Sequence, residues 1–594
     1  MNRKFPILAV VLFSLVFMIN AQAQNDWKTP AEKTDYRTTP TYDETRAFIE
    51  RLDRASPLVK LTSFGKTAQG RDLMLIVAAK DADKMTPELA RKQGKAIVLI
   101  QACIHAGESD GKDAGLALLR DIAITKNQQN LLESVVILFE PIYNADGHER
   151  RSPYNRINQN GPEEMGWRGN GRNINLNRDY MKADELETKA WLRLWNLWNP
   201  DFFIDCHVTN GADYQYDLTY QFEHHETVAP AIKNWLETAI EGRAVAATEK
   251  NGHLLSPYLQ FADNRDLSKG IFEFVASPRF ASTYPVLRNR PAILIETHML
   301  KPYKTRVIAT YDFILAMLAE INQNSGDLFG TIKQAETQEA DKYFSSYNAN
   351  TKFPLSLKLT DKSTPFQLKA VESKVEKSEI SGADWVKFDS SKPFNITIPF
   401  FNQTEIAASV APPIAYVVPA QWIEVIERLE LHGLKIERTT KPQTFEVEMY
   451  RLTQPKWAPA SFESRVMLTD FKSAVFNEKR QFPAGSVIVR LNQPNAKAAV
   501  HLLEPAAPDS LLRWGFFNPI FEQKEYGESY VLEKLSREML AKDADLKREF
   551  EERLKTDENF AKNPRARLNF FFERSPYFDK NIGLYPVGRI IKFE

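Results

Sequence analysis

Residues 96–108 read AIVLIQACIHAGE, an apolar run that leads into a histidine and a glutamate three residues apart. The part from Ala96 to Cys103 has the length and the apolar side chains of a buried β-strand. Open α/β sheets bind ligands at the edge where such strands end. Zinc in a catalytic site takes imidazole nitrogen and carboxylate oxygen from the protein and leaves a fourth position for water. His105 and Glu108 are therefore candidate zinc ligands.

A second apolar run ends in a histidine in the same way. Residues 202–207 read FFIDCH, and His207 follows His105 by 102 residues. A lone histidine at a strand end is more often a hydrogen-bonded core or loop residue than a metal ligand. Two such strands that end beside each other in one sheet bring the three side chains together. We predict that His207 is the third ligand of a site for one zinc ion.

The wider region from Trp27 to Asn324 alternates apolar, strand-like runs with longer amphipathic stretches, which is typical of an α/β architecture. The expected strands are Leu73–Ala79, Ala96–Cys103, Val135–Ile142, Phe202–Cys206 and Ala292–Glu296. The expected helices are Asp113–Thr125, Glu185–Trp198, Val228–Val245 and Thr305–Ile321. We predict a mixed, mostly parallel sheet flanked by helices.

The character of the sequence changes after this region. Residues 330–385 contain few large apolar side chains, while Phe353–Leu359 and Phe394–Phe401 alternate like strands. From Pro412 onward, a strand, a helix and a second strand are expected at Ile414–Val418, Trp422–Leu431 and Gly433–Arg438. We predict a signal peptide over 1–23, a catalytic domain over 24–330, a β-rich connector over 331–411 and a smaller C-terminal α/β domain of unassigned role over 412–594.

The first residues have the pattern of a secretory signal. Arg3 and Lys4 precede the apolar run Phe5–Ile19, and Ala21-Gln22-Ala23 matches a small-residue cleavage site. An apolar run of about 15 residues is short for a bilayer span. We expect a secreted or periplasmic protein with no membrane span after the signal is removed; an uncleaved anchor is the alternative.

The composition argues against two kinds of partner. The chain has 77 basic and 77 acidic residues, so it lacks the net charge that favours nucleic acid or an anionic membrane. The aromatic and basic residues of the tail over 563–594 are accordingly expected to pack rather than to bind nucleic acid. Cys103 and Cys206 are the only cysteines, and we favour two buried thiols over a disulfide beside the site.

Further motifs occur in a definite order along the chain. They are TAQGR at 67–71, NADG at 144–147, GWR at 166–168, GRNINLNR at 171–178 and a late strand that ends in Glu296. Together with the H-x-x-E pair and His207, these segments resemble the zinc carboxypeptidase family, of the carboxypeptidase A/B type, over residues 35–325. The resemblance implies a secreted, bacterial-type zinc metallocarboxypeptidase with a C-terminal extension. Such a hydrolase cleaves peptides that have a free C-terminal carboxylate.

The resemblance also implies roles for single residues. Arg168 would polarise the scissile carbonyl and stabilise the oxyanion, and Asn177 and Arg178 would hold the terminal carboxylate of the substrate. Tyr284 would correspond to the family's mobile, substrate-covering tyrosine. Glu296 interrupts an apolar run, where a carboxylate is costly unless it is paired or does chemistry. We predict that Glu296 is the general base, which takes a proton from a zinc-activated water and passes it to the leaving amine.

Some positions depart from the family pattern or lie outside it. Ala145 stands where the family usually has proline, and Asn175 replaces an aspartate that orients the first zinc-binding histidine. His298 is a candidate auxiliary proton carrier, although a packing or loop role is favoured. His224 and His225 are expected to point apart in an exposed linker, so no metal is assigned to them.

Two other functions stay open at this point. One is a related deacylase or muropeptide amidase, and the other is a non-catalytic binding protein on the same fold. Arg178 favours a substrate with a free carboxylate, and the complete ligand set with Glu296 argues against a binding protein. The sequence indicates neither the side-chain preference nor whether cleavage is terminal or internal.

Overall fold

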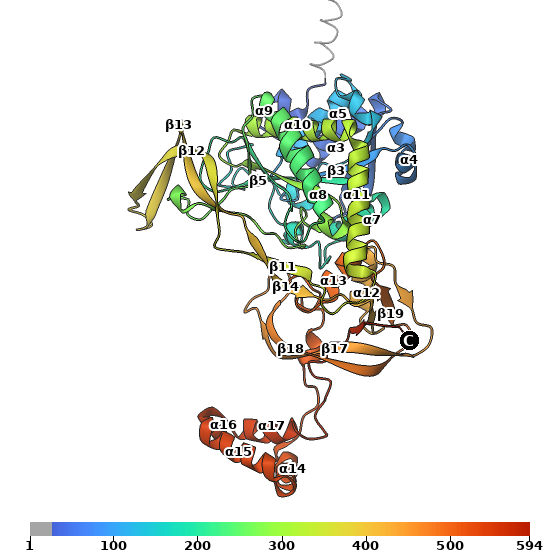
Figure 1. The fold of residues 1–594 in the computed structure, drawn as a ribbon. Helices are drawn as coiled ribbons and strands as arrows, with labels where there is room; N and C mark the ends of the chain where they lie inside the picture. The colour runs from blue at the N-terminus through green and yellow to red at the C-terminus, as the bar shows by residue number, and fades with distance from the viewer. Residues whose placement is uncertain (1–26, 594) are drawn as a thin grey trace, which may run out of the picture.

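The computed structural model describes residues 27–593, which form a large upper body, a smaller sheet body below it and a helical bundle at the far end (Figure 1). The predicted signal peptide over 1–23 lies outside the described residues. Within 27–593, no helix combines the length and the hydrophobicity needed to cross a bilayer.

The upper body is built on an eight-stranded sheet. In spatial order its strands are β1 (Val59–Lys66), β2 (Asp72–Ala78), β4 (Val135–Glu140), β3 (Ala96–Gln101), β5 (Phe202–Thr209), β10 (Ala292–His298), β6 (Leu218–Gln221) and β7 (Leu255–Pro257). The central strands β4, β3, β5 and β10 are parallel to one another, and β2 and β6 flank them in antiparallel pairs. The predicted mixed, mostly parallel sheet is confirmed.

Helices cover both faces of this sheet. Alternate residues of β3 point to opposite faces, so Ile97 and Leu99 belong to one apolar cluster while Val98 and Ile100 belong to another. The first cluster includes α7 (Leu186–Trp198) and α4 (Pro87–Lys92). The second includes α3 (Tyr42–Ala55), α5 (Asp110–Ala123), α8 (Pro230–Trp235), α10 (Tyr303–Gln323) and α11 (Ser325–Glu339). Burial on both faces explains the continuous apolar runs of the central strands.

Most predicted strands and helices differ from the observed ones only at their ends. The helix predicted over 228–245 is an exception, because it is not one regular helix. It consists of α8 followed by a π-helical stretch, η4 (Leu236–Ala244), and the chain continues into α9 (Val245–Lys250). Strands β1, β6 and β7 were not predicted, because β1 is half exposed and the other two are too short to show a period. Short helical turns complete the upper body: α2 (Pro30–Lys33), η1 (Ala82–Lys84), η2 (Gln129–Glu133), α6 (Ala145–Glu149), η3 (Leu176–Arg178), η5 (Leu267–Lys269), η6 (Tyr284–Arg288) and η7 (Ala340–Phe344).

The residues that follow add two antiparallel ribbons. Strand β11 (Phe353–Leu359) pairs with β14 (Thr404–Val410), and β12 (Thr364–Lys377) pairs with β13 (Asp384–Phe401) in a long hairpin that projects from the upper body (Figure 1). The end of β13 pairs with β9 (Ile271–Phe272), which in turn pairs with β8 (Gln260–Phe261). These ribbon residues are therefore hydrogen-bonded to the 260–272 segment of the upper body.

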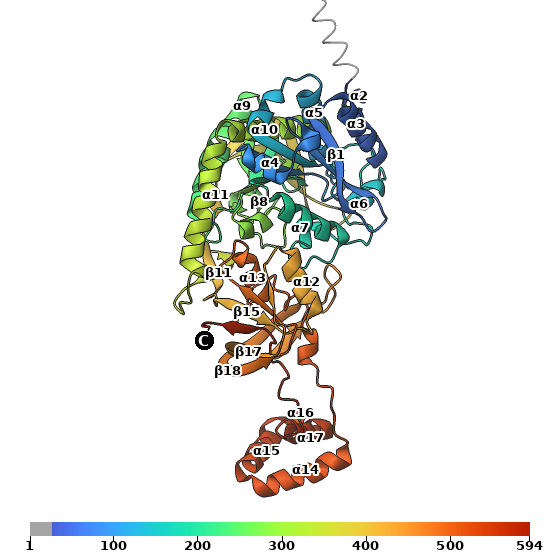
Figure 2. The same ribbon diagram turned by 90° about the vertical axis from the view of Figure 1, so that its right-hand side faces the viewer.

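The lower body is a six-stranded sheet. Its spatial order is β16 (Glu437–Arg438), β19 (Val487–Arg490), β15 (Ala415–Val418), β20 (Gly588–Ile590), β17 (Gln443–Trp457) and β18 (Leu468–Phe482). The helices α12 (Ile423–Leu431) and α13 (Ala496–Leu503) lie between this sheet and the upper body (Figure 2). Trp191 of α7 shares one apolar cluster with Leu429 and Leu502, so the two bodies are packed through a common core.

A bundle of helices hangs from the lower body on two connecting segments (Figure 2). Its members are α14 (Ser529–Lys542), α15 (Ala544–Thr556), α16 (Glu558–Lys562) and α17 (Pro564–Phe572), and a short turn, η8 (Asn518–Phe521), precedes it. Phe560, Phe570 and Phe571 are buried against one another inside the bundle. The phenylalanines of the tail therefore pack, as predicted.

Candidate metal centre and active-site cavity

The three predicted ligands lie together at the ends of β3 and β5. The Nδ1 atom of His105 is 3.2 Å from Oε1 of Glu108 and 3.2 Å from Nδ1 of His207. The Nδ1 atom of His207 is 3.1 Å from Oε2 of Glu108. Atoms that bind one zinc ion tetrahedrally at roughly 2.0–2.1 Å lie about 3.3 Å apart. The spacing of the three side chains therefore fits a single ion.

A sharp turn after β3 presents His105 and Glu108 to the cavity. The N–H of Glu108 donates to the carbonyl of His105, and Cys103 has a φ of 59°, in the left-handed region that few non-glycine residues adopt. A Cβ at Gly107 would come within 2.8 Å of a neighbouring backbone carbonyl oxygen, so the turn requires glycine there. Backbone strain of this kind is common at functional sites. Cys103 and Cys206 are both buried free thiols, as predicted.

Each histidine has a partner on the ring nitrogen that faces away from the cluster. Oδ2 of Asp205 is 2.9 Å from Nε2 of His207, and Oδ1 of Asn175 is 3.2 Å from Nε2 of His105. Such partners fix the tautomer and the orientation of a metal-binding imidazole. We did not predict Asp205, although the signal was present, because a carboxylate two residues before His207 in an apolar strand must share its face.

Burial and neighbouring charges set the ionisation of the three candidate ligands. Burial opposes the ionisation of Glu108, but His105 and Arg156, whose Nη2 is 2.7 Å from Oε1, hold the pKa of Glu108 well below its usual value. Burial lowers the pKa of His105 to about 3, so this imidazole is neutral. Burial also lowers the pKa of His207, but the carboxylates of Asp205 and Glu108 outweigh it and raise that pKa well above its usual value. Zinc binds an ionised carboxylate and neutral imidazoles, so its binding would displace the proton that His207 otherwise holds.

Glu296 lies on β10 directly beside His207 of β5, with which it is paired in register. Its Oε2 atom is buried and has no hydrogen-bond partner among the described residues. Burial raises the pKa of Glu296 to about 8, and the charge of Glu108 acts in the same direction. The Glu296 carboxyl group is therefore able to exchange a proton near neutral pH.

The loop residues Arg168, Asn177 and Arg178 line the same cavity as the triad. Nη1 of Arg168 is 3.7 Å from Oε1 of Glu108. The guanidinium of Arg178 lies 4.1 Å from the ring centroid of Phe280 and donates from Nη1 to the carbonyl oxygen of Asn177 at 2.6 Å, but no carboxylate pairs with it among the described residues. Oδ1 of Asn177 accepts a hydrogen bond from the backbone of residue 281, which ties the loop to the segment after β9. An unpaired guanidinium in a cavity is suited to bind a carboxylate of a ligand.

The cavity that joins these groups has a volume of about 1040 Å³. The rest of its wall is formed by Tyr258, Leu259, Gln260, Phe261, Asn264, Phe274, Phe280 and Ser282, together with Val208–Gly211 and Leu294. Glu108 and Glu296 are the only carboxylates among its described lining residues. We did not predict this wall, because the segment over 258–282 is irregular and shows neither a helical nor a strand period.

Tyr284 and His298 lie away from the cavity lining. Tyr284 is fully buried, packs edge-on against Trp191 and hydrogen-bonds through its hydroxyl to Nδ1 of His432 at 2.8 Å. The predicted substrate-covering role of Tyr284 therefore has no support here, because its ring belongs to the core between the two bodies. His298 is also fully buried, with its ring 4.5 Å from that of Tyr214, which is the packing role that we favoured.

A loop of the lower body reaches the metal centre. Oε2 of Glu463 accepts a hydrogen bond from the backbone N–H of Asn175 at 2.8 Å, and Arg465 of the same loop pairs with Asp184. Because Asn175 orients His105, this loop supports the first ligand indirectly. The contact joins residues 288 positions apart, so no local pattern in the sequence indicates it.

Two imidazoles and a carboxylate around one point, with an unpartnered carboxyl group beside them, have the composition expected of a metallohydrolase site. The family model for zinc carboxypeptidases matches residues 45–380, which is more than half of the chain. The chain therefore belongs to the zinc carboxypeptidase family and is a hydrolase of the metallopeptidase class.

Named relatives resemble the chain over most of their length. It is 23% identical to Carboxypeptidase 2 of Trichophyton rubrum over 498 residues, which cover 81% of this chain and 85% of that protein. It is 24% identical to Probable carboxypeptidase 2 of Arthroderma benhamiae over 499 residues, 81% of this chain and 87% of that protein. These matches cover 81% of the chain, whereas the residues that precede the lower body make up a smaller share of it. The similarity therefore extends into the lower body.

Solved structures resemble a smaller part of the chain. A metallo-carboxypeptidase from Burkholderia cenocepacia is 17% identical, with a TM-score of 0.36, over 48% of this chain and 70% of that one. The carboxypeptidase A from Helicoverpa armigera is 13% identical, with a TM-score of 0.36, over 49% of this chain and 75% of that one.

Proposed function

We propose that the chain is a zinc-dependent metallocarboxypeptidase that hydrolyses the C-terminal amide bond of peptides with a free terminal carboxylate. One observation carries this proposal. The His105–Glu108–His207 triad, the carboxyl group of Glu296 and the unpaired guanidinium of Arg178 all open on one cavity. A cation site, a proton carrier and an anion receptor are the three parts that removal of a C-terminal residue requires.

In this proposal His105, Glu108 and His207 hold one zinc ion. When bound, zinc supplies a Lewis acid that polarises a carbonyl oxygen and makes water nucleophilic near neutral pH. Glu296 takes the proton of the attacking water on its unpartnered Oε2 and delivers it to the leaving amine. Arg168, close to Glu108 at the edge of the triad, stabilises the negative charge that develops on the carbonyl oxygen. No covalent intermediate is needed.

The substrate end of the proposal rests on Arg178 and Asn177. The guanidinium fork of Arg178 receives the terminal carboxylate in two parallel hydrogen bonds. The oxygen of Asn177 is already bonded to backbone, so its NH₂ group is the part offered to the substrate. A neutral amide substrate would leave Arg178 unpaired in the cavity, which favours a carboxypeptidase over a deacylase or a muropeptide amidase.

The location and the domain division are also proposals. We propose that residues 1–23 are removed on export, so that the mature chain begins at Gln24 and acts in the periplasm or outside the cell. N-terminal sequencing of the exported protein tests this, and an intact Met1 on the active form would overturn it. The boundary proposed at residue 330 falls inside helix α11, which packs in the upper body, so limited proteolysis tests the boundary proposed at residue 411.

The decisive experiment compares metal content by mass spectrometry with hydrolysis of N-blocked dipeptides for the wild type and for Glu296→Gln. We expect the variant to keep its zinc at the triad and to lose about 10²- to 10⁴-fold in kcat, because its amide cannot carry the proton. Glu187→Gln is the matched control, since Glu187 is a buried glutamate outside the cavity. A Glu296→Gln enzyme with wild-type activity, or a zinc-loaded wild type that releases no C-terminal residue, would contradict the proposal.

A further inference from the structure

The pair His224 and His225 does not lie as the sequence predicted. The two rings stack, with centroids 4.2 Å apart and planes at 30°, and both approach Glu273, which follows β9. His225 is 9% exposed, Glu273 is 8% exposed, and Glu223 is buried beside them. The prediction of an exposed linker with diverging side chains was wrong, because the chain after β6 is neither strand nor helix and its successive side chains are free to converge.

Two of the distances in this cluster match those of the first centre, and its three donor atoms all lie within 4.8 Å of one another. Nε2 of His224 is 3.3 Å from Oε1 of Glu273, and Nε2 of His225 is 3.3 Å from Oε2. Ligands of one tetrahedral zinc ion are about 3.3 Å apart. On the side where the three groups meet, Nε2 of His225 and Oε2 of Glu273 nevertheless lack a hydrogen-bond partner among the described residues. Buried polar atoms are rarely left unpartnered, so these atoms point to a ligand that they share.

The outer nitrogens of the two rings are arranged as they are in metal-binding histidines. Nδ1 of His224 is 3.3 Å from the carbonyl oxygen of Phe222, and Nδ1 of His225 faces Oε2 of Glu223 at 3.6 Å. An Nδ1–H that donates to a carbonyl leaves Nε2 unprotonated, with its lone pair available to a metal. The first centre has the same arrangement, with a carboxylate behind its second histidine.

We propose that His224, His225 and Glu273 bind a second divalent transition-metal ion, with Zn²⁺ as the probe. Two imidazoles and one carboxylate form a donor set that zinc accepts. His224 and Glu273 also line a cavity of about 630 Å³, which leaves the remaining coordination position open to water. The carboxylates of Glu273 and Glu223 balance the charge of the ion.

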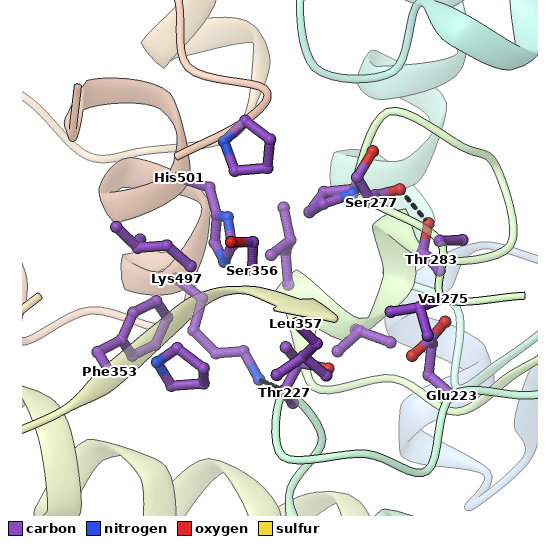
Figure 3. Close-up of a pocket in the computed structure, with 17 residues that line it drawn as sticks. Glu223, Thr227, Val275, Ser277, Thr283, Phe353, Ser356, Leu357, Lys497 and His501 are labelled. Carbon is purple, nitrogen blue, oxygen red and sulfur yellow. Dashed lines mark hydrogen bonds between the residues drawn. The ribbon is translucent and has the colours of Figure 1, made fainter. Parts of the chain in front are cut away.

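An ion bound at Glu273 would lie next to a segment that forms part of the wall of the catalytic cavity. Glu273 directly precedes Phe274, which lines that cavity and accepts a hydrogen bond from the side chain of Gln221 just before the histidine pair. On the other side, Glu223 and Val275 both line a separate cavity of about 880 Å³ between the upper and lower bodies (Figure 3). The ion therefore fixes the start of the 273–283 segment, which forms part of the catalytic wall. Loss of the ion should raise KM more than it lowers kcat.

Metal stoichiometry of the full-length protein tests the proposal. After loading with Zn²⁺ and gel filtration, we expect two equivalents per chain in the wild type and one in the double variant His224→Ala/His225→Ala. A double substitution of the two histidines of the first centre should also leave one equivalent. Replacement of Zn²⁺ by Co²⁺ gives each site a visible absorption band, and the band of the second site should disappear in His224→Ala/His225→Ala.

His253→Ala is the matched control. His253 also lies between two carboxylates, but Asp217 and Asp312 contact opposite nitrogens of its ring, at 3.3 and 3.1 Å, and so share no centre. The His253→Ala protein should keep both equivalents.

If His224→Ala/His225→Ala fails to fold, Glu273→Gln decides, because a carboxamide should weaken binding of the second Zn²⁺ by at least about tenfold. One equivalent in the wild type, a second equivalent that persists in the double variant, or unchanged affinity in Glu273→Gln would overturn the proposal.

Discussion

Replacing Asp205 by asparagine should weaken zinc binding at the His105–Glu108–His207 centre by about 10- to 100-fold, or about 1.4–2.8 kcal/mol. Oδ2 of Asp205 is 2.9 Å from Nε2 of His207, and both side chains are almost fully buried. Asparagine keeps an oxygen at that position but removes the negative charge. The imidazole of His207 then becomes a weaker electron donor, and the site loses part of its attraction for a cation.

The upper part of this range is expected because Asp205 is firmly held. Its Oδ1 accepts from Nε2 of Gln101 at 3.0 Å, and Oε1 of Gln101 accepts from the hydroxyl of Tyr180 at 2.9 Å. In a buried network of this kind each hydrogen bond strengthens the next, and no solvent compensates for a lost charge. Asn175→Asp adds a negative charge at the partner of His105 and should therefore tighten zinc binding. The gain in affinity should be smaller than the loss in Asp205→Asn, because Asn175 is partly exposed.

Competition with a chromophoric chelator at neutral pH gives the Kd of each variant, and thermal unfolding of the metal-free proteins checks that each is folded. Asp201→Asn is the control. Asp201 is a buried carboxylate just before the same strand, but it pairs with Arg91 and with the backbone N–H of Ile97, away from the site. It should lower stability and leave the Kd unchanged. An unchanged Kd for Asp205→Asn, or an equal loss in Asp201→Asn, would refute the reasoning.

Three other predictions follow from the same structure. Arg178→Gln should raise KM for peptides with a free C-terminal carboxylate by roughly 100-fold, since a charge-assisted pair is lost; amidated peptides should be unaffected, and steady-state kinetics on matched peptide pairs decides. Glu463→Ala should raise the zinc Kd by about threefold, because Asn175 loses its backbone anchor; chelator titration measures this, and an unchanged Kd would show that the lower body does not support the ligand. Burial raises the pKa of Glu187 from 4.5 to about 7, so the folded state disfavours the ionised form, and the wild type loses stability relative to Glu187→Gln as pH rises through that interval. Urea unfolding should find the variant more stable by up to about 3 kcal/mol at about pH 8 and equal at about pH 4; a difference independent of pH would contradict this.

The sequence predicts those parts of the site that lie on regular strands. His105, His207 and Glu296 each end or occupy an apolar run, and the sheet fixes how such strand ends meet. The strand pattern alone is therefore enough to place these side chains together. Their assignment as ligands and general base is still a proposal.

Residues on irregular segments could not be placed in this way. Tyr284 lies only 12 positions before Glu296, yet its ring is taken up by the core around Trp191. Glu463 approaches the metal centre only because the lower body packs against α7. His225 converges on Glu273 through a loop, for which the alternation rule of strands does not hold. In each case the deciding contact is long-range, and local periodicity carries no information about it.

The chemistry and the choice of substrate depend on different kinds of structure in this chain. The triad and Glu296 come from neighbouring strands whose hydrogen bonds fix their spacing. The cavity wall over 258–282 is irregular and needs outside support, which β13 supplies by pairing with β9 and, in our proposal, a metal ion supplies at Glu273. The pairing is close, because any side chain at Gly270 would collide with the carbonyl of Pro399. Changes in β13 should therefore alter which peptides are cleaved, whereas changes at the strand ends should abolish cleavage. Although the connector contains none of the candidate ligands and none of the residues that line the cavity, it supports the cavity wall through the pairing of β13 with β9.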